Sequence, residues 1–198
     1  MAMMPINVNL LTNASPLHDV DGIIIFMFTI QLLTTTPSDL TRGGLIELLR
    51  DSVEGGASVG FLAPLKRELA EAFWRDMLRE AETPQRVILI ATTEDGEVAG
   101  SVQLALVQKE NGRHRAEVQK LLVHSRYRNQ GLGRRLMEAI EHEARQRGIT
   151  LLVLDTIEGE LAEQLYLKLG YVRVGEIPNY ASFPDGRLWA TVIFYKQP

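Results

Sequence analysis

Apolar side chains along this chain recur with two different spacings, and the spacing changes from segment to segment. After Pro64, the residues Leu65, Leu69, Phe73 and Met77 recur at every fourth position, which is the period of one face of a helix. The segments RVILIATT (86–93) and TLLVLDT (150–156) are instead short apolar runs of strand length. Segments of both kinds follow one another along the chain, which predicts an α/β fold.

The same two patterns, followed to the end of the chain, predict seven strands and four helices. Turn signals at Glu94-Asp95-Gly96 and Asn111-Gly112 join the three middle strands as hairpins. Later helices cross over between strands, so we expect a mixed, mostly antiparallel central sheet flanked by about four helices. The expected strands are 28–33, 86–93, 97–108, 116–123, 150–156, 171–177 and 188–196, and the helices are 37–53, one that begins at Pro64, one that ends at Gly148, and 160–170.

The most apolar stretch of the chain is GIIIFMFTI, residues 22–30. No lysine or arginine precedes Arg42, so the positive region of a secretory signal is missing. The stretch is also shorter than the roughly 20 residues that span a bilayer, and we expect a buried strand.

Residues 1–26 form an N-terminal extension with two open explanations. They are an extra strand that covers a sheet edge or pairs with a second subunit, or an upstream read-in before a true start at Met27.

Composition narrows the class of protein. A formal net charge of −4 and 45% hydrophobic residues are typical of a soluble globular protein. They argue against the basic surface that nucleic-acid binding needs. The chain has no cysteine, which excludes disulfides, thiolate metal ligands and a cysteine nucleophile, and which fits a cytoplasmic location. His114 and His124 have no second ligand at metal spacing, so we expect no metal site.

Residues 126–137, RYRNQGLGRRLM, gather four arginines around two glycines between a predicted strand and a predicted helix. The first N–H groups of a helix and the positive end of its dipole attract anions, and glycine lets a ligand approach the backbone closely. The turn is therefore either an ordinary solvated helix start or a phosphate socket. A Walker-type loop is rejected because its lysine and hydroxyl are missing. A dinucleotide-binding turn fits poorly, because Leu136 stands at its third small position and too few residues follow Asp155.

The segment RNQGLG (128–133) resembles the R-x-x-G-x-G pyrophosphate loop of the GNAT superfamily of N-acetyltransferases. With the order of the elements and the helix exit AEQLYLKLGY (162–171), the resemblance extends over about 28–196. It implies a GNAT-like fold, an N-acetyltransferase domain over 27–198, and acetyl-CoA as the acetyl donor. Three further segments are similar to the tabtoxin-resistance acetyltransferases of this superfamily, which implies an amino-acid-like acceptor. They are EGGASVGFLAPL (54–65), NGRHRAEVQKLLV (111–123) and GEIPNYASFPDGRLWATVIFYK (175–196).

The resemblance also implies where acetyl-CoA binds. Its pantetheine arm would lie along the backbone of Leu121, Leu122 and Val123, whose side chains can at the same time belong to the core. Its pyrophosphate would meet backbone N–H groups of the turn, with Arg128 or Arg134 adding positive charge. An ordinary helix cap stays open for each arginine. The residues of that turn are Asn129, Gln130, Gly131, Leu132, Gly133 and Arg134.

Two residues are candidates for proton transfer. The resemblance of the helix that carries Tyr166 implies that it is the general acid for the leaving thiolate, and the ordinary pKa values of phenol and thiol, about 10 and 8.5, are close enough for this. Its alternative is a half-buried aromatic. Asp155, at the end of a predicted strand, is the predicted base for the incoming ammonium, and its alternative is a capping box for the next helix. Glu117 and Glu158 are reserve bases. Many family members carry an asparagine seven residues before the tyrosine, where this chain has Gly159.

The expected function is therefore direct transfer of acetyl from acetyl-CoA to the amine of a small molecule, an amino-acid-like toxin or metabolite. A peptide or protein amine is the alternative acceptor, and a module that binds acyl-CoA without turnover is the alternative from another class. We expect no nucleic-acid or membrane partner. A homodimer is open, because the apolar residues 23–26 need to be covered.

Overall fold

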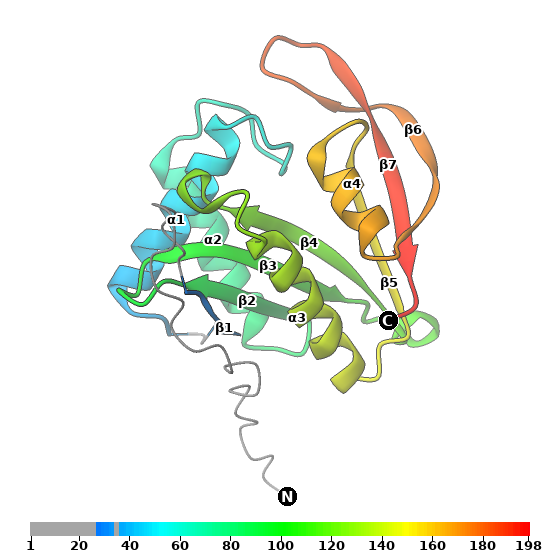
Figure 1. Ribbon diagram of the computed structural model, residues 1–198, viewed down its shortest axis with the longest axis horizontal. Helices are drawn as coiled ribbons and strands as arrows, with labels where there is room; N and C mark the ends of the chain where they lie inside the picture. The colour runs from blue at the N-terminus through cyan, green and yellow to red at the C-terminus, as the bar shows by residue number, and fades with distance from the viewer. Residues whose placement is uncertain (1–26, 34–35) are drawn as a thin grey trace, which may run out of the picture.

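In the computed structural model, which describes residues 27–33 and 36–198, a seven-stranded sheet has the order β1-β2-β3-β4-β5-β7-β6 (Figure 1). Neighbouring strands are antiparallel except β4 and β5, which are parallel. The predicted mixed, mostly antiparallel sheet is confirmed. Its strands are β1 (Thr29–Leu32), β2 (Arg86–Thr92), β3 (Val98–Leu106), β4 (Arg115–Val123), β5 (Leu151–Ile157), β6 (Val172–Ser182) and β7 (Leu188–Lys196).

Helices cover both faces of this sheet, as Figure 1 shows. They are α1 (Asp39–Glu54), α2 (Arg67–Ala81), α3 (Leu132–Gln146) and α4 (Leu161–Lys168). The helices α1 and α2 pack on one face around the fully buried Leu45, Leu49 and Trp74. On the other face, α3 packs through Leu136 and Ile140, and α4 joins the same core. Two apolar cores therefore hold the sheet between them, and burial of this kind is the main favourable term in folding.

The ends of the predicted helices have local causes. Ser38 is the N-cap of α1, and its hydroxyl accepts a hydrogen bond from the Thr41 N–H at 3.1 Å. Gly131 precedes α3 with a φ of 73°, and Gly148 follows it with a φ of 72°. These left-handed values favour glycine over any residue with a Cβ.

Two boundaries differ from the prediction by more than two residues. The helix α2 begins at Arg67 rather than at Pro64, because the backbone at Leu65 is tied to α1 instead. The Leu65 N–H donates to Glu54 at 3.0 Å, and its carbonyl accepts from Arg50 at 3.3 Å. Strand β6 runs on to Ser182, past an irregularity between residues 177 and 181.

Residues 1–26 lie outside the described residues, so the strand and read-in explanations for them stay predictions, as does most of the predicted apolar strand at 22–30. Within the described part of the chain, none of the helices is long and apolar enough to cross a membrane.

A bulge interrupts β4 near its middle. Ser101 and Gln103 of β3 face Leu122 and Gln119 of β4, so β4 carries one residue more than β3 over this step. The extra length is absorbed at Lys120, which has a φ of 51°. A bulge of this kind bends a strand and redirects a side chain.

The strands β4 and β5 separate soon after they begin. Their parallel pairing joins only Arg115, Ala116 and Glu117 to residues 151–153. Beyond these pairs β5 keeps its other neighbour, β7, as far as Ile157. The side of β4 that faces β5 is therefore left without a strand partner from residue 118 onward, which opens the middle of the sheet.

Candidate active site

A cavity of about 510 Å³ lies where β4 and β5 separate. Residues 117–121 of β4 and 155–157 of β5 form two of its walls, and α4 contributes a third. Residues 56–60, from the loop between α1 and α2, and parts of β6 and β7 complete the lining. Asp155 and Tyr166, the two predicted catalytic residues, both line this cavity.

The start of α3 lies beside the same opening. A Cβ added at Gly133 would be 3.6 Å from Leu165 of α4 and 3.8 Å from Val123 at the end of β4, so the first turn of α3 sits between these elements. None of the backbone N–H groups of residues 129–134 donates a hydrogen bond to another described residue. Unpaired N–H groups at a helix start are a ready site for an anion. This turn is therefore suited to bind a phosphate group through its backbone.

The four arginines of this segment already have partners within the protein. Arg126 is 3.3 Å from the Glu97 carboxylate, and Arg134 is 2.8 Å from Glu138 on the surface of α3. Arg135 donates to the backbone carbonyl of residue 28 at 2.9 Å. Arg128 donates through Nε to the Val123 carbonyl at 3.1 Å. The predicted anion contacts of Arg128 and Arg134 thus compete with contacts they already make.

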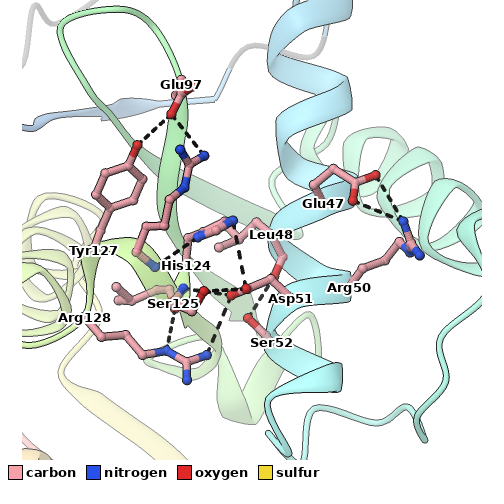
Figure 2. Close-up of polar contacts among 12 residues, drawn as sticks. Glu47, Leu48, Arg50, Asp51, Ser52, Glu97, His124, Ser125, Tyr127 and Arg128 are labelled. Atoms are coloured by element: carbon pink, nitrogen blue, oxygen red, sulfur yellow. Dashed lines mark hydrogen bonds and ion pairs between the residues drawn. The ribbon is translucent and has the colours of Figure 1, made fainter.

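Asp51, near the end of α1, is the centre of the polar contacts that hold this segment (Figure 2). Its carboxylate accepts hydrogen bonds from the Ser125 N–H at 2.8 Å and the Ser125 hydroxyl at 2.7 Å. Arg128 approaches the same carboxylate to 3.8 Å and His124 to 4.0 Å. Sequence reasoning missed Asp51, because 74 residues separate it from Ser125. It fastens α1 to the segment that leads into α3.

The three residues predicted to line the pantetheine arm have different environments. Leu121 lines the cavity and also packs against the core that contains α3. Leu122 is buried in the core on the opposite face. Val123 packs beside Leu121, and its carbonyl is occupied by Arg128. Their side chains therefore belong to the core, and the free edge of β4 is what they offer to a ligand.

Tyr166 is buried, with 6% of its surface exposed, and packs near Tyr171 and Phe194. It also lines the cavity, so a buried aromatic is compatible with the predicted general acid, which stays a prediction. Burial raises the pKa of its phenol well above the ordinary value, and the nearby Asp155 carboxylate adds to the rise. The phenol therefore keeps its proton at neutral pH, as a general acid must.

Asp155 is an exposed residue within β5 and accepts a hydrogen bond from the Thr191 hydroxyl at 2.8 Å. The alternative interpretation, a capping box for the next helix, is wrong. The N-cap of α4 is Glu160, which makes no side-chain capping bond. β5 continues to Ile157, so Asp155 lies five residues before the helix cap and faces the cavity instead.

The two reserve bases are separated by the fold. Glu117 lines the cavity, whereas Glu158 does not and lies 3.4 Å from Arg173 on the surface. Gly159, which stands in place of the family asparagine, has a φ of 80° and donates its N–H to Glu163 at 2.8 Å. Because glycine has no side chain, only the backbone of Gly159 can contact a ligand at this turn.

The cavity also contains a cation that the sequence analysis passed over. Lys120 lies in the bulge of β4 and lines the cavity. A run such as VQKLLV gives no sign of a bulge, because the extra residue appears only when β4 is aligned with β3. Among residues 27–33 and 36–198, no group of three or more histidine, aspartate or glutamate side chains is arranged to hold a metal ion.

Comparison with known proteins agrees with this geometry. The model of the acetyltransferase (GNAT) family matches residues 50–171. An uncharacterized N-acetyltransferase from the hisH-hisA intergenic region of Azospirillum brasilense is 35% identical over 116 residues, which cover 58% of this chain and 67% of that protein.

Solved structures show the same fold. A GNAT-family acetyltransferase from Streptococcus pneumoniae is 25% identical, with a TM-score of 0.70, over 87% of this chain and 100% of that chain. The structure of yncA from Salmonella typhimurium with its cofactor acetyl-CoA is 20% identical, with a TM-score of 0.69, over 86% of this chain and 94% of that chain.

Proposed function

Since this chain belongs to the GNAT family of acetyltransferases, we propose that it transfers the acetyl group of acetyl-CoA to the amine of a small, amino-acid-like molecule. Membership of the family makes the chain an N-acetyltransferase.

Two features of the described residues fit acetyl-CoA. The open edge of β4 beyond residue 117 can accept an extended chain with amide groups, as an added strand would be accepted. The unpaired N–H groups of residues 129–134 stand at the end of that edge and suit a pyrophosphate. The related structure of yncA was solved with acetyl-CoA, which supports the same donor here.

The size of the cavity supports a small acceptor. A volume of about 510 Å³ is in the usual range for small-molecule sites, roughly 300–1,000 Å³. Residues 56–60, Tyr180 and Ala181 line this space together with Asp155. The similarity of 54–65 and 175–196 to the tabtoxin-resistance acetyltransferases falls on these walls and favours an amino-acid-like molecule.

The residues of the cavity divide the proton transfers between them. When bound, acetyl-CoA supplies the thioester whose acetyl group is transferred. Asp155 takes a proton from the acceptor's ammonium group, directly or through a water, so that the neutral amine can attack. Tyr166 gives its phenolic proton to the departing sulfur. The nitrogen loses its second proton as the amide forms, and that proton restores the Tyr166 phenol through solvent, while Asp155 releases its own proton to solvent.

The observation that carries this proposal is that unpaired helix-start N–H groups, an open strand edge and the pair Asp155 and Tyr166 lie around one opening. Calorimetric titration with acetyl-CoA tests it, using the wild type and Gly131→Asp. The substitution puts a negative charge among the N–H groups, and we expect affinity at least about tenfold weaker, the equivalent of one charge-assisted hydrogen bond.

Gly148→Asp is the matched control. Gly148 follows the other end of α3, has nearly the same φ as Gly131 (72° against 73°), and also leaves open space around an added Cβ. Both variants carry the same backbone strain, so only a charge effect at the socket separates them. No binding of acetyl-CoA by the folded wild type would overturn the proposal, and binding without turnover on any amine would leave an acyl-CoA-binding module.

A further inference from the structure

The bulge in β4 decides where the Lys120 side chain points. Ala116 and Val118, before the bulge, pack into the core that contains α3. In an unbroken strand, residue 120 would face that core as well, because side chains alternate with a period of two. After the bulge, Leu121 packs into that core instead, so the alternation has moved by one residue. Lys120 is thereby released from the core.

The ammonium group of Lys120 reaches across the cavity to the loop between α1 and α2. Its Nζ lies 3.9 Å from where a Cβ at Gly60 would stand and 6.0 Å from the centre of the Phe73 ring. Both residues lie on the α1 and α2 side of the sheet. Because Gly60 has no side chain, the space next to Nζ is left open.

Lys120 has no anionic partner within the described residues: no carboxylate lies within 4.0 Å of its Nζ. Burial lowers its pKa, the positive charge of Arg86 lowers it further, and Asp155 and Glu117 partly offset this. A partly buried ammonium group without a close counter-ion gains from any anion that enters the cavity.

The charges around the cavity form a pattern. Lys120 is the one cation among the described residues that line it, whereas Glu117, Asp155 and Glu160 supply three carboxylates. We propose that Lys120 binds a free carboxylate of the acceptor, while Asp155 receives the acceptor's ammonium group. The acceptor is then an amino acid or a close derivative that carries both charges. This inference rests on the proposed function and specifies its substrate class.

A panel of matched acceptors tests the inference. The full chain is supplied with acetyl-CoA and, in turn, with the common amino acids, their carboxamides and their decarboxylated amines. Thiol release is recorded with a thiol reagent, to which this cysteine-free chain adds no background. We expect a kcat/KM about 10- to 100-fold higher for the best amino acid than for its carboxamide, the range of one charge-assisted hydrogen bond.

Lys120→Met keeps the length of the side chain and removes its charge. We expect the ratio of kcat/KM between amino acid and carboxamide to fall close to one, because the KM of the amino acid rises while the KM of the carboxamide stays the same. Lys120→Arg should keep most of the preference. Lys109→Met, which removes an exposed lysine outside the cavity, should keep all of it.

Each other result overturns the inference in its own way. Equal use of amino acid and carboxamide by the wild type, or a preference that survives in Lys120→Met, rejects carboxylate binding and leaves N-acetyl transfer standing. An equal fall in kcat for both acceptors in Lys120→Met means that Lys120 only positions Asp155. Acetylation of no member of the panel rejects this inference and the proposed small-molecule acceptor together.

Discussion

Replacing Asp51 by asparagine should loosen the segment that leads into α3 while leaving the shape of the side chain nearly unchanged. In the wild type, both carboxylate oxygens accept hydrogen bonds from Ser125, at 2.8 Å from the N–H and 2.7 Å from the hydroxyl. An amide offers one oxygen and one NH₂ group, so the hydroxyl keeps a contact only if it turns to accept from the NH₂, and both contacts lose the negative charge that strengthens them. The attraction to Arg128, 3.8 Å away, is lost with the charge (Figure 2).

The expected loss can be estimated from this geometry. A hydrogen bond to a charged group contributes about 1.5–3 kcal/mol to stability. The Asp51 side chain is 22% exposed, so water partly replaces the lost contact and the low end of the range applies. We therefore expect the free energy of unfolding to fall by about 1.5–2 kcal/mol, and Tm to fall by roughly 3–8 °C in a chain of this size.

Urea unfolding at pH 7 measures the stability change, and calorimetry with acetyl-CoA measures its effect on the turn at residues 129–134. Affinity should weaken by about 3- to 10-fold, because binding must then restore order to the segment. Asp76→Asn is the control, since Asp76 makes only exposed ion pairs on α2, and it should change stability by less than about 0.5 kcal/mol. If Asp51→Asn matched that control in both assays, Asp51 would not be what holds the segment.

Three further outcomes are expected. Tyr166→Phe should lower kcat by about 10²- to 10⁴-fold in steady-state assays and leave the Kd of acetyl-CoA unchanged, since only the proton donor is removed. Burial raises the pKa of Tyr166 and Tyr171 above the ordinary 10.0, so the folded chain keeps protons that the unfolded chain loses. Stability should therefore fall as pH rises above about 10, less steeply in Tyr171→Phe, as urea unfolding at pH 8–11 would measure. Gly43→Ala should raise the free energy of unfolding by roughly 0.5–1 kcal/mol, because an added Cβ meets no atom within 4 Å. Gly44→Ala should lower it by up to about 2 kcal/mol, because its Cβ would lie 2.8 Å from the buried Val98, and equal thermal shifts of the two variants would contradict this.

Those parts of the fold that depend on neighbours in sequence could be predicted. Gly148 after an apolar period and the turn at residues 94–96 each act within a few residues, and both ended or joined elements as predicted. Ser38 also acts locally, but it is the N-cap of a helix that was predicted to begin at Pro37. The start of α2 could not be predicted, because Leu65 is held by residues of α1 that precede it by 11 and 15 positions. The bulge at Lys120 depends in the same way on alignment with another strand.

In the candidate site, too, residues placed by their own element could be predicted, and residues placed by distant contacts could not. Asp155 was predicted from its place at the end of a strand, and Tyr166 from its place in a helix that resembles the family's; both line the cavity. The place of Lys120 in the cavity could not be predicted, because in an unbroken strand its side chain would face the core. The role of Asp51 could not be predicted either, because its side chain can bind Ser125 only when α1 lies against the end of β4.

The arginines among residues 126–135 of this acidic chain make contacts within the protein, whatever charge they add for a phosphate. Arg126 is bound to Glu97, Arg128 to Val123 and Asp51, and Arg135 to the backbone of residue 28. Guanidinium groups suit such contacts because they donate from several nitrogens in a fixed plane. Among the residues that the structure describes, the backbone N–H groups of 129–134 find no hydrogen-bond acceptor. These three arginines thus tie the segment to other parts of the fold, and N–H groups held in place would bind a phosphate at a lower cost in entropy than flexible side chains would.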